Sequence, residues 1–134
     1  MIRFKVIVLP HPDFPMAGPV SIKADVEILA LVADYFKVLS EVSRLQILSC
    51  LKAGAMNVTE LTEVTGLGQA NLSKHLKVLT QAGILTRQTQ GVSAYYSIAD
   101  PTILSICDTV CDRISQRLQK QAEVVNLLDV FSSQ

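Results

Sequence analysis

The sequence lacks any run of about eighteen apolar residues, so we expect no segment that spans a membrane. It also lacks a phosphate-binding loop and any nucleophile set beside a base and an orienting group, which argues against an enzyme. Its apolar opening is too short for a signal peptide, and no small-residue cleavage site follows. The three cysteines are therefore expected to be reduced thiols in the cytoplasm. With 49% apolar residues, the 134-residue chain should fold as one domain.

The chain has no excess charge of either sign, because twelve basic residues balance twelve acidic ones. This balance and a pI near 6.7 give no signal for nucleic acid. However, no Asp or Glu occurs between residues 64 and 99, a segment that contains Lys74, Lys77 and Arg87. Carboxylates there would repel DNA phosphates, so this segment has a composition suited to approaching DNA. Three positive charges are too few for tight binding by one chain, and we expect two copies to act together.

Proline and glycine interrupt the first twenty residues, at Pro10, Pro12, Pro15, Gly18 and Pro19. Neither a helix nor a strand interior accommodates this pattern. We therefore expect residues 1–20 to form a flexible N-terminal arm and residues 21–130 to form the folded domain. An alternative is that Met16 is the natural start and that the preceding residues are non-native or misassigned.

The segment from Asn57 to Gly83 has the pattern of two short helices joined by a tight turn. Asn57 with Glu60 forms a helix-capping pair, and Gly66 is suited to the left-handed end of that helix. Apolar residues of the first helix are Val58, Leu61 and Val64, and those of the second are Leu72, Leu76 and Leu79. The second set recurs at the spacing of one buried helix face. This arrangement predicts a helix-turn-helix.

The opposite face of the second helix carries polar side chains that can bond base edges and phosphates. The candidate DNA-binding residues are Gln69, Asn71, Ser73, Lys74, His75 and Lys77 of the helix, with Arg87 and Gln90 following it. We expect Gln69, Asn71 and Ser73 to lie nearest the bases, and Lys74 and Lys77 to contact phosphates or the groove. His75 is expected at the edge of the helix, as a structural or phosphate-facing group rather than a metal ligand.

Two strand-like runs, residues 85–89 and 92–98, follow the second helix and are joined at Gln90 and Gly91. In the second run Val92, Ala94, Tyr96 and Ile98 should share one face. A helix-turn-helix followed by such a hairpin is the winged-helix arrangement. The alternative is a helical hairpin and a β-hairpin packed together for stability without any role in binding.

Three further helices are predicted, two before this segment and one after it. The first covers about residues 23–39, the second begins at Glu41 and ends before Gly54, and the last runs from Asp100 and Pro101 to about Val130. The second should bury Leu45, Leu48 and Leu51. The apolar stripe of the first is Ile28, Leu31, Val32, Tyr35 and Leu39, and that of the last is Cys107, Cys111, Ile114, Leu118, Ala122 and Val125. A small domain cannot cover stripes of this length by itself, so we expect a dimer interface there.

Residues 36–51, FKVLSEVSRLQILSCL, are similar to the start of the second helix in the ArsR/SmtB repressors. Further matches to that family are Ser73, Lys74, His75, Leu76, Leu79, Ala82 and Gly83 in the recognition helix, and Tyr95, Tyr96, Ile98, Asp100 and Pro101 after the wing. The resemblance covers about residues 25–118. It implies a mainly α-helical winged helix-turn-helix homodimer that represses transcription and leaves its double-stranded operator DNA when an inducer binds. The wing departs from the family because Arg87 stands without the usual additional arginines.

The resemblance also implies an inducer site, which lies at different positions in different members. The arsenite-type cysteine pair would fall on Asn57 and Thr59, neither of which binds soft metals. The zinc-type site needs two histidines in the last helix, whereas the only histidines are His11 and His75. Both sites are therefore expected to be absent.

The three cysteines Cys50, Cys107 and Cys111 remain as candidate sensory residues. Cys107 and Cys111 are four residues apart on one helix, with β-carbons about 5–6 Å apart, which suits chelation better than a disulfide. They could bind As(III), Cd(II) or Zn(II), with a third ligand from Cys50, the partner chain or water. Alternatives are oxidation or persulfidation of these thiols, and burial as ordinary packing residues. A further alternative is a dimeric thiol- or protein-binding module that does not read DNA.

Overall fold

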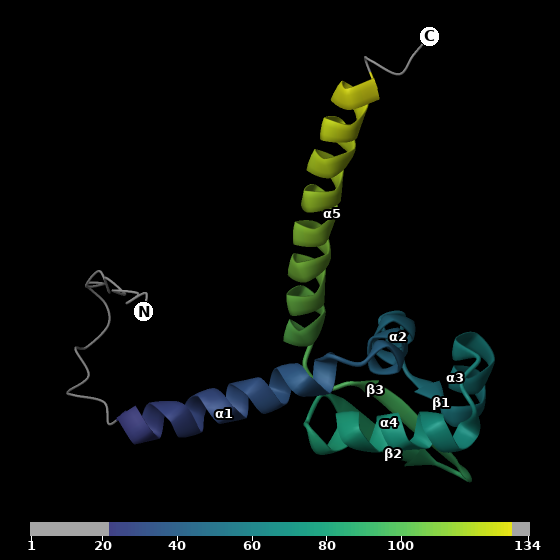
Figure 1. The fold of residues 1–134 in the computed structure, drawn as a ribbon. Helices are drawn as coiled ribbons and strands as arrows, with labels where there is room; N and C mark the ends of the chain where they lie inside the picture. Colours follow the sequence, from purple (N-terminus) through teal and green to yellow (C-terminus); the bar gives the residue numbers. More distant parts are fainter. Residues whose placement is uncertain (1–21, 130–134) are drawn as a thin grey trace. The chain divides into compact units, whose positions relative to one another are not determined.

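The computed structural model describes residues 22–129 as mainly helical, with one small antiparallel sheet (Figure 1). The elements are α1 (Ile22–Leu39), α2 (Val42–Leu51), β1 (Met56–Asn57), α3 (Val58–Thr65), α4 (Gln69–Gln81), β2 (Leu85–Gln90), β3 (Ser93–Ile98) and α5 (Thr102–Leu128). The predicted order of four helices, a hairpin and a last helix is confirmed, and the fold is a winged helix-turn-helix.

The chain divides into two units, Met1–Asp34 and Tyr35–Gln134, and the boundary falls within α1. The described part of the first unit is one helix, on which Val26, Ile28, Leu29, Leu31 and Val32 are exposed. The second unit contains the end of α1 and all other elements. The predicted arm of residues 1–20 and the predicted helix end near Val130 lie outside the described residues.

The ends of α3 are set by the two residues that the sequence indicated. The Asn57 side chain accepts a hydrogen bond from the backbone N–H of Glu60 (2.8 Å), and Glu60 Oε2 accepts one from the backbone N–H of Asn57 (3.2 Å). This reciprocal pair satisfies two amide groups that the helix leaves free. Gly66 ends α3 with a φ of 72°, which places it in the left-handed region. The predicted cap and stop are therefore confirmed.

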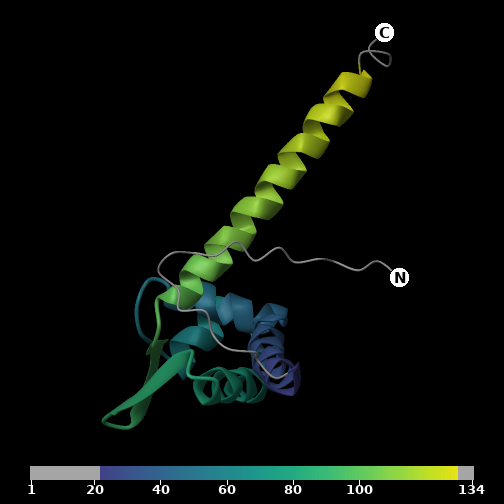
Figure 2. The same ribbon diagram turned by 90° about the vertical axis from the view of Figure 1, so that its left-hand side faces the viewer.

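The wing is part of a three-stranded antiparallel sheet in the order β1-β3-β2. Leu85 pairs with Ile98 and Gln90 with Ser93, so β2 and β3 form the predicted hairpin, which projects from the helices in Figure 2. Val92 was predicted to lie on the strand, but it is in the turn after Gly91 and is fully exposed. The two-residue strand β1 was not predicted, because pairing with β3 defines it and no local pattern does.

The core of the second unit is built mainly from leucine and isoleucine side chains. Buried members are Leu39, Ile47, Leu48, Leu51, Leu61, Leu72, Leu76, Leu79, Ile84, Leu85 and Ile103. The burial predicted for Leu45 and Val64 is wrong, since they are 41% and 55% exposed. Ile47 is completely buried in place of Leu45, because α2 packs against α3, α4 and β3 and turns that side inward.

Arg44 and Glu41 fix the connection between α1 and α2. The Arg44 guanidinium donates hydrogen bonds to the carbonyl oxygens of Val38 and Lys37 at the end of α1. Glu41 Oε2 accepts a hydrogen bond from the backbone N–H of Arg44 (3.2 Å) and caps the start of α2. A basic side chain at a helix C-terminus satisfies carbonyls that have no partner within the helix. The short link between the two helices is thus held from both sides.

The start of α5 is capped by Asp100, whose Oδ1 accepts a hydrogen bond from the backbone N–H of Thr102 (2.9 Å). This bond is the main cause of the lowered pKa of the Asp100 carboxyl. The helix begins at Thr102, one residue later than predicted. Ile103 is buried, but every residue from Asp108 to Asp129 is exposed. None of the helices described between residues 22 and 129 is long and apolar enough to cross a membrane.

Candidate functional site

Helix α4 presents a polar face to solvent on the side opposite its core contacts. Leu72, Leu76 and Leu79 are completely buried, and this fixes the rotation of the helix about its axis. The outward side chains Gln69, Asn71, Ser73, Lys74 and Lys77 are all exposed, as predicted from their spacing. The helix starts after Gly68, which has no side chain to cap the first amide groups. The exposed face therefore offers amide, hydroxyl and ammonium groups together.

His75 does not belong to this exposed face. Its side chain is buried, with 6% exposure, and its Nε2 lies 3.6 Å from Glu41 Oε2 at the start of α2. Its Nδ1 is buried without a hydrogen-bond partner among the residues described. The prediction that His75 contacts DNA is therefore wrong. The side chain instead links α4 to the start of α2.

The wing contributes few groups that could bind DNA. Arg87 and Gln90 are both exposed on β2, and Arg87 lies opposite Tyr96 of β3. Arg87 is the one basic residue of the hairpin, as the sequence indicated. The wing can thus supply a single positive charge per chain, and the main polar surface is that of α4.

Cys107 and Cys111 line an apolar groove in the second unit with a volume of about 450 Å³. Its walls come from the end of α1, from α2 and from the first half of α5. The apolar lining consists of Phe36, Leu39, Leu45, Leu48, Leu104, Ile106, Val110 and Ile114. Lys52 and Asp108 also line it, and their Nζ and Oδ1 atoms are 3.5 Å apart. Cys107 is half-buried, whereas Cys111 is exposed.

Cys50 is not among the residues that line this groove. It packs against the core cluster, and its neighbour Ser49 faces the groove instead. Among residues 22–129, no three His, Cys, Asp or Glu side chains are grouped so that they could hold a metal ion. The structure thus gives no support for Cys50 as a third ligand within the same chain. One chain supplies two thiols there.

Burial raises the pKa of the Cys107 thiol, and the nearby Cys111 and Asp108 raise it further. Burial also raises the pKa of Tyr35, with smaller contributions from Asp100 and Cys107. Both effects favour the protonated form, because a new negative charge would be poorly solvated and close to other acidic groups. A ligand that binds the Cys107 sulfur must therefore displace its proton.

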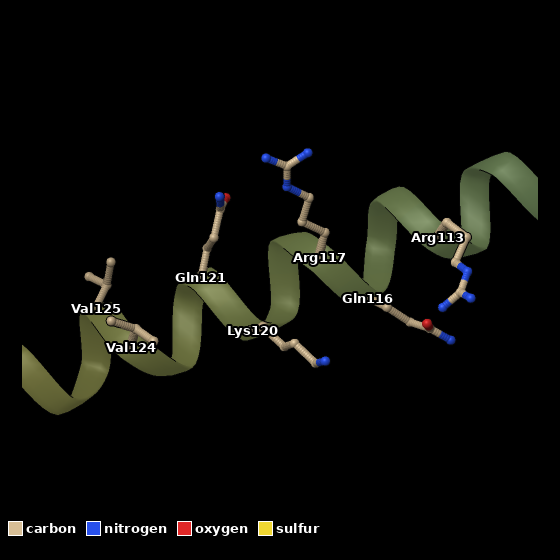
Figure 3. A pocket seen from close by; sticks show the side chains of 7 residues that line it. All are labelled: Arg113, Gln116, Arg117, Lys120, Gln121, Val124 and Val125. Atoms are coloured by element: carbon tan, nitrogen blue, oxygen red, sulfur yellow. The ribbon is translucent and has the colours of Figure 1, made fainter. Parts of the chain in front are cut away.

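A second hollow, of about 760 Å³, lies along the outer part of α5 (Figure 3). It is lined by Arg113, Gln116, Arg117, Lys120, Gln121, Val124 and Val125. All seven residues come from one helix, and in Figure 3 Arg117 and Gln121 point away from Gln116 and Lys120. The hollow is therefore an open helix surface without walls from another element.

Comparison with known proteins identifies the family. A model described as the bacterial regulatory protein, arsR family, matches residues 41–87. The chain is 36% identical over 78 residues to the arsenical resistance operon repressor of Bacillus subtilis (strain 168), covering 58% of this chain and 74% of that one. The chain belongs to the ArsR family. This ArsR-family protein is also 34% identical over 84 residues to the regulator NmtR of Mycobacterium tuberculosis, covering 63% and 70% of the two chains.

Solved structures similar to this ArsR-family protein support the same assignment. The crystal structure of M. tuberculosis Rv0081 has a TM-score of 0.66 and 31% identity, covering 71% of this chain and 96% of that one. The solution structure of the homodimeric winged helix-turn-helix DNA-binding domain of Mb0332 from Mycobacterium bovis has a TM-score of 0.65 and 30% identity, covering 77% and 94%. Membership of a family of regulatory proteins confirms that the chain is not an enzyme.

The family match bears on the two candidate regions differently. Residues 41–87 include α4 but end before α5, so Cys107 and Cys111 lie outside the matched segment. The sequence interpretation also missed the groove itself and the role of Ser49 in it. No local pattern marks the groove, because its walls come from three helices that are distant in sequence.

Proposed function

We propose that this ArsR-family chain is a homodimeric transcriptional repressor that binds double-stranded operator DNA through α4 and the wing. The observation that carries this proposal is the exposed polar face of α4, in a segment of 36 residues without a carboxylate. Gln69, Asn71 and Ser73 would read base edges, because their amides and hydroxyl can donate and accept hydrogen bonds. Lys74 and Lys77 would contact phosphates, together with Arg87 and Gln90 of the wing.

The apolar side chains that α1 and α5 leave exposed support a dimer. Ile28 and Leu31 of α1 are 56% and 70% exposed, and Ile114 and Leu118 of α5 are 53% and 58% exposed. Exposed apolar area of this kind usually marks an interface. A second copy of the chain would cover it and would double the positive charge offered to DNA, which a single chain lacks. The Mb0332 domain, which is similar to this chain, is described as homodimeric.

The inducer in this proposal is a soft metal or metalloid ion held by Cys107 and Cys111, such as As(III), Cd(II) or Zn(II). Thiolates are the ligands that soft ions prefer. A third ligand would come from the partner chain or from water. Two relatives are described as repressors of arsenical and mercury resistance operons. A coupling of about 1–3 kcal/mol between this site and α4 would weaken operator binding by roughly 5- to 150-fold, which is enough for derepression.

A thiol-redox or persulfide response is the second candidate, because Cys111 is exposed and open to small oxidants. A disulfide between Cys107 and Cys111 is disfavoured by their spacing in an intact helix. Since Ser49 rather than Cys50 faces the groove, oxidation would more readily give an adduct with a small thiol or persulfide. In either case reduced cysteines are required, which fits a cytoplasmic protein.

The test is binding of the purified protein to DNA from the region upstream of its own gene, followed by fluorescence anisotropy. Affinity should fall log-linearly as salt rises, and arsenite, cadmium, zinc or a persulfide donor should release the DNA. Replacing both Cys107 and Cys111 with serine should keep binding and remove the response, while Cys50→Ser should change neither. No retention at low salt would instead favour a protein-binding module. Release from the double variant would place the sensor elsewhere.

A further inference from the structure

The groove beside Cys107 and Cys111 bears on the identity of the inducer. Trivalent arsenic makes three bonds in a pyramidal arrangement, so inorganic arsenite needs a third ligand after two thiols have bound. No third His, Cys, Asp or Glu is grouped with these two cysteines among the residues that the structure describes. An arsenical that already carries a carbon substituent has its third position filled. Two thiols then complete its coordination.

We propose that the inducer is a monosubstituted trivalent arsenical, R–As(OH)₂, with R a small aryl or alkyl group that lies in the apolar groove. This inference rests on the proposed function, because it names the ligand of the same two cysteines. Cys107 and Cys111 bind the arsenic, and the organic group contacts the side chains that line the groove.

The groove has the size and chemistry for such a group. Its volume of about 450 Å³ is within the range of roughly 300–1,000 Å³ typical of small-molecule sites. Leu45 and Leu48 of α2 face Leu104 and Val110 of α5 across it, so the lining is apolar. The charged side chains Lys52 and Asp108 are close enough to pair with each other. A neutral hydrocarbon group therefore meets no unbalanced charge, whereas an inorganic ion would leave this apolar surface unused.

The binding reaction is a condensation without any change of oxidation state. Two S–H bonds of the cysteines and two As–O bonds of R–As(OH)₂ break. Two As–S bonds form, and each hydroxide leaves with one thiol proton as water. The reaction needs no oxidant and no third protein group.

The experiment compares phenylarsine oxide, methylarsonous acid and arsenite as ligands of the full-length protein. Mass spectrometry of the intact chain measures the adduct, and displacement from upstream DNA measures the response. We expect one phenylarsenic per chain with the loss of two free thiols. Phenylarsine oxide should release DNA at a concentration about tenfold or more below that of arsenite, since burying an aryl group adds apolar stabilisation. Cys107→Ser and Cys111→Ser should each abolish this response, and Cys50→Ser should retain it.

A groove variant separates this inference from general thiol reactivity. Leu45→Asp places a charge in the groove at a side chain that is 41% exposed, so the fold should tolerate it. The preference for phenylarsine oxide over arsenite should fall toward unity in this variant. Equal or tighter binding of arsenite by the parent protein would overturn the inference and leave the proposed function standing. If none of the arsenicals, cadmium, zinc or a persulfide donor releases the DNA, the sensory function itself is wrong.

Discussion

Replacing Lys74 with alanine should reduce the salt dependence of operator binding by an amount that the structure defines. Lys74 is exposed on the outward face of α4, and the dimer presents it twice. Each phosphate contact contributes about 0.9 to the slope of log affinity against log salt concentration. Removing one contact per chain should therefore lower the slope by about 1.8. Replacing Lys77 as well should lower it by about 3.6 in total, if the two side chains contact separate phosphates.

The assay is fluorescence anisotropy with upstream DNA at several potassium chloride concentrations. The matched control is Lys120→Ala, which removes an exposed lysine from the outer part of α5. That variant should keep the slope of the parent protein. Thermal melting should be unchanged for all variants, because none of these side chains is buried. A parent-like slope for a folded Lys74→Ala protein would show that this face of α4 does not meet phosphates.

Other predictions address DNA binding, the fold and the dimer separately. Lys74→Glu should abolish DNA binding without lowering the melting temperature, and a folded variant with parental affinity would mean that α4 is misassigned as the recognition helix. Asn57→Ala should lower the free energy of unfolding by about 1 kcal/mol in a urea titration, because it removes the reciprocal cap of α3; Thr59→Ala, at an exposed position in the same helix, should have a smaller effect. Leu118→Asp should shift the dimer to monomer in light scattering and weaken DNA binding, since it charges the exposed stripe of α5. Gln116→Asp adds the same charge at a polar position of that helix, and a monomer from both variants would exclude a specific effect of the stripe.

Local signals in the sequence predicted the features that depend on neighbouring residues. The cap at Asn57 and the stop at Gly66 involve residues within one helix, and both are confirmed. The burial of Leu72, Leu76 and Leu79 follows from their spacing along a helix of thirteen residues. Features that depend on distant partners could not be predicted in the same way. β1 exists because β3 pairs with it, and the buried side of α2 is set by three other elements.

The burial of His75 could have been predicted from the same spacing. Its position three residues after Leu72 and four before Leu79 places it within the apolar stripe rather than at the edge. A polar residue type in an apolar stripe indicates a buried partner, here Glu41. For the cysteines, the helical spacing of Cys107 and Cys111 was informative, but the exclusion of Cys50 from the groove was not visible. A rotation of one residue on α2 decides between Cys50 and Ser49.

The paired anchoring of the link between α1 and α2 has a mechanical consequence. Arg44 bonds the last carbonyls of α1, and Glu41 bonds Arg44 and lies against His75 inside α4. Polar side chains thus join the end of α1 to the middle of the recognition helix without passing through flexible backbone. A loop held in this way has little slack, so a displacement of the last turn of α1 reaches α4 at nearly full size. The stiffness of this joint, more than the length of the helices, determines how small a movement α4 can register.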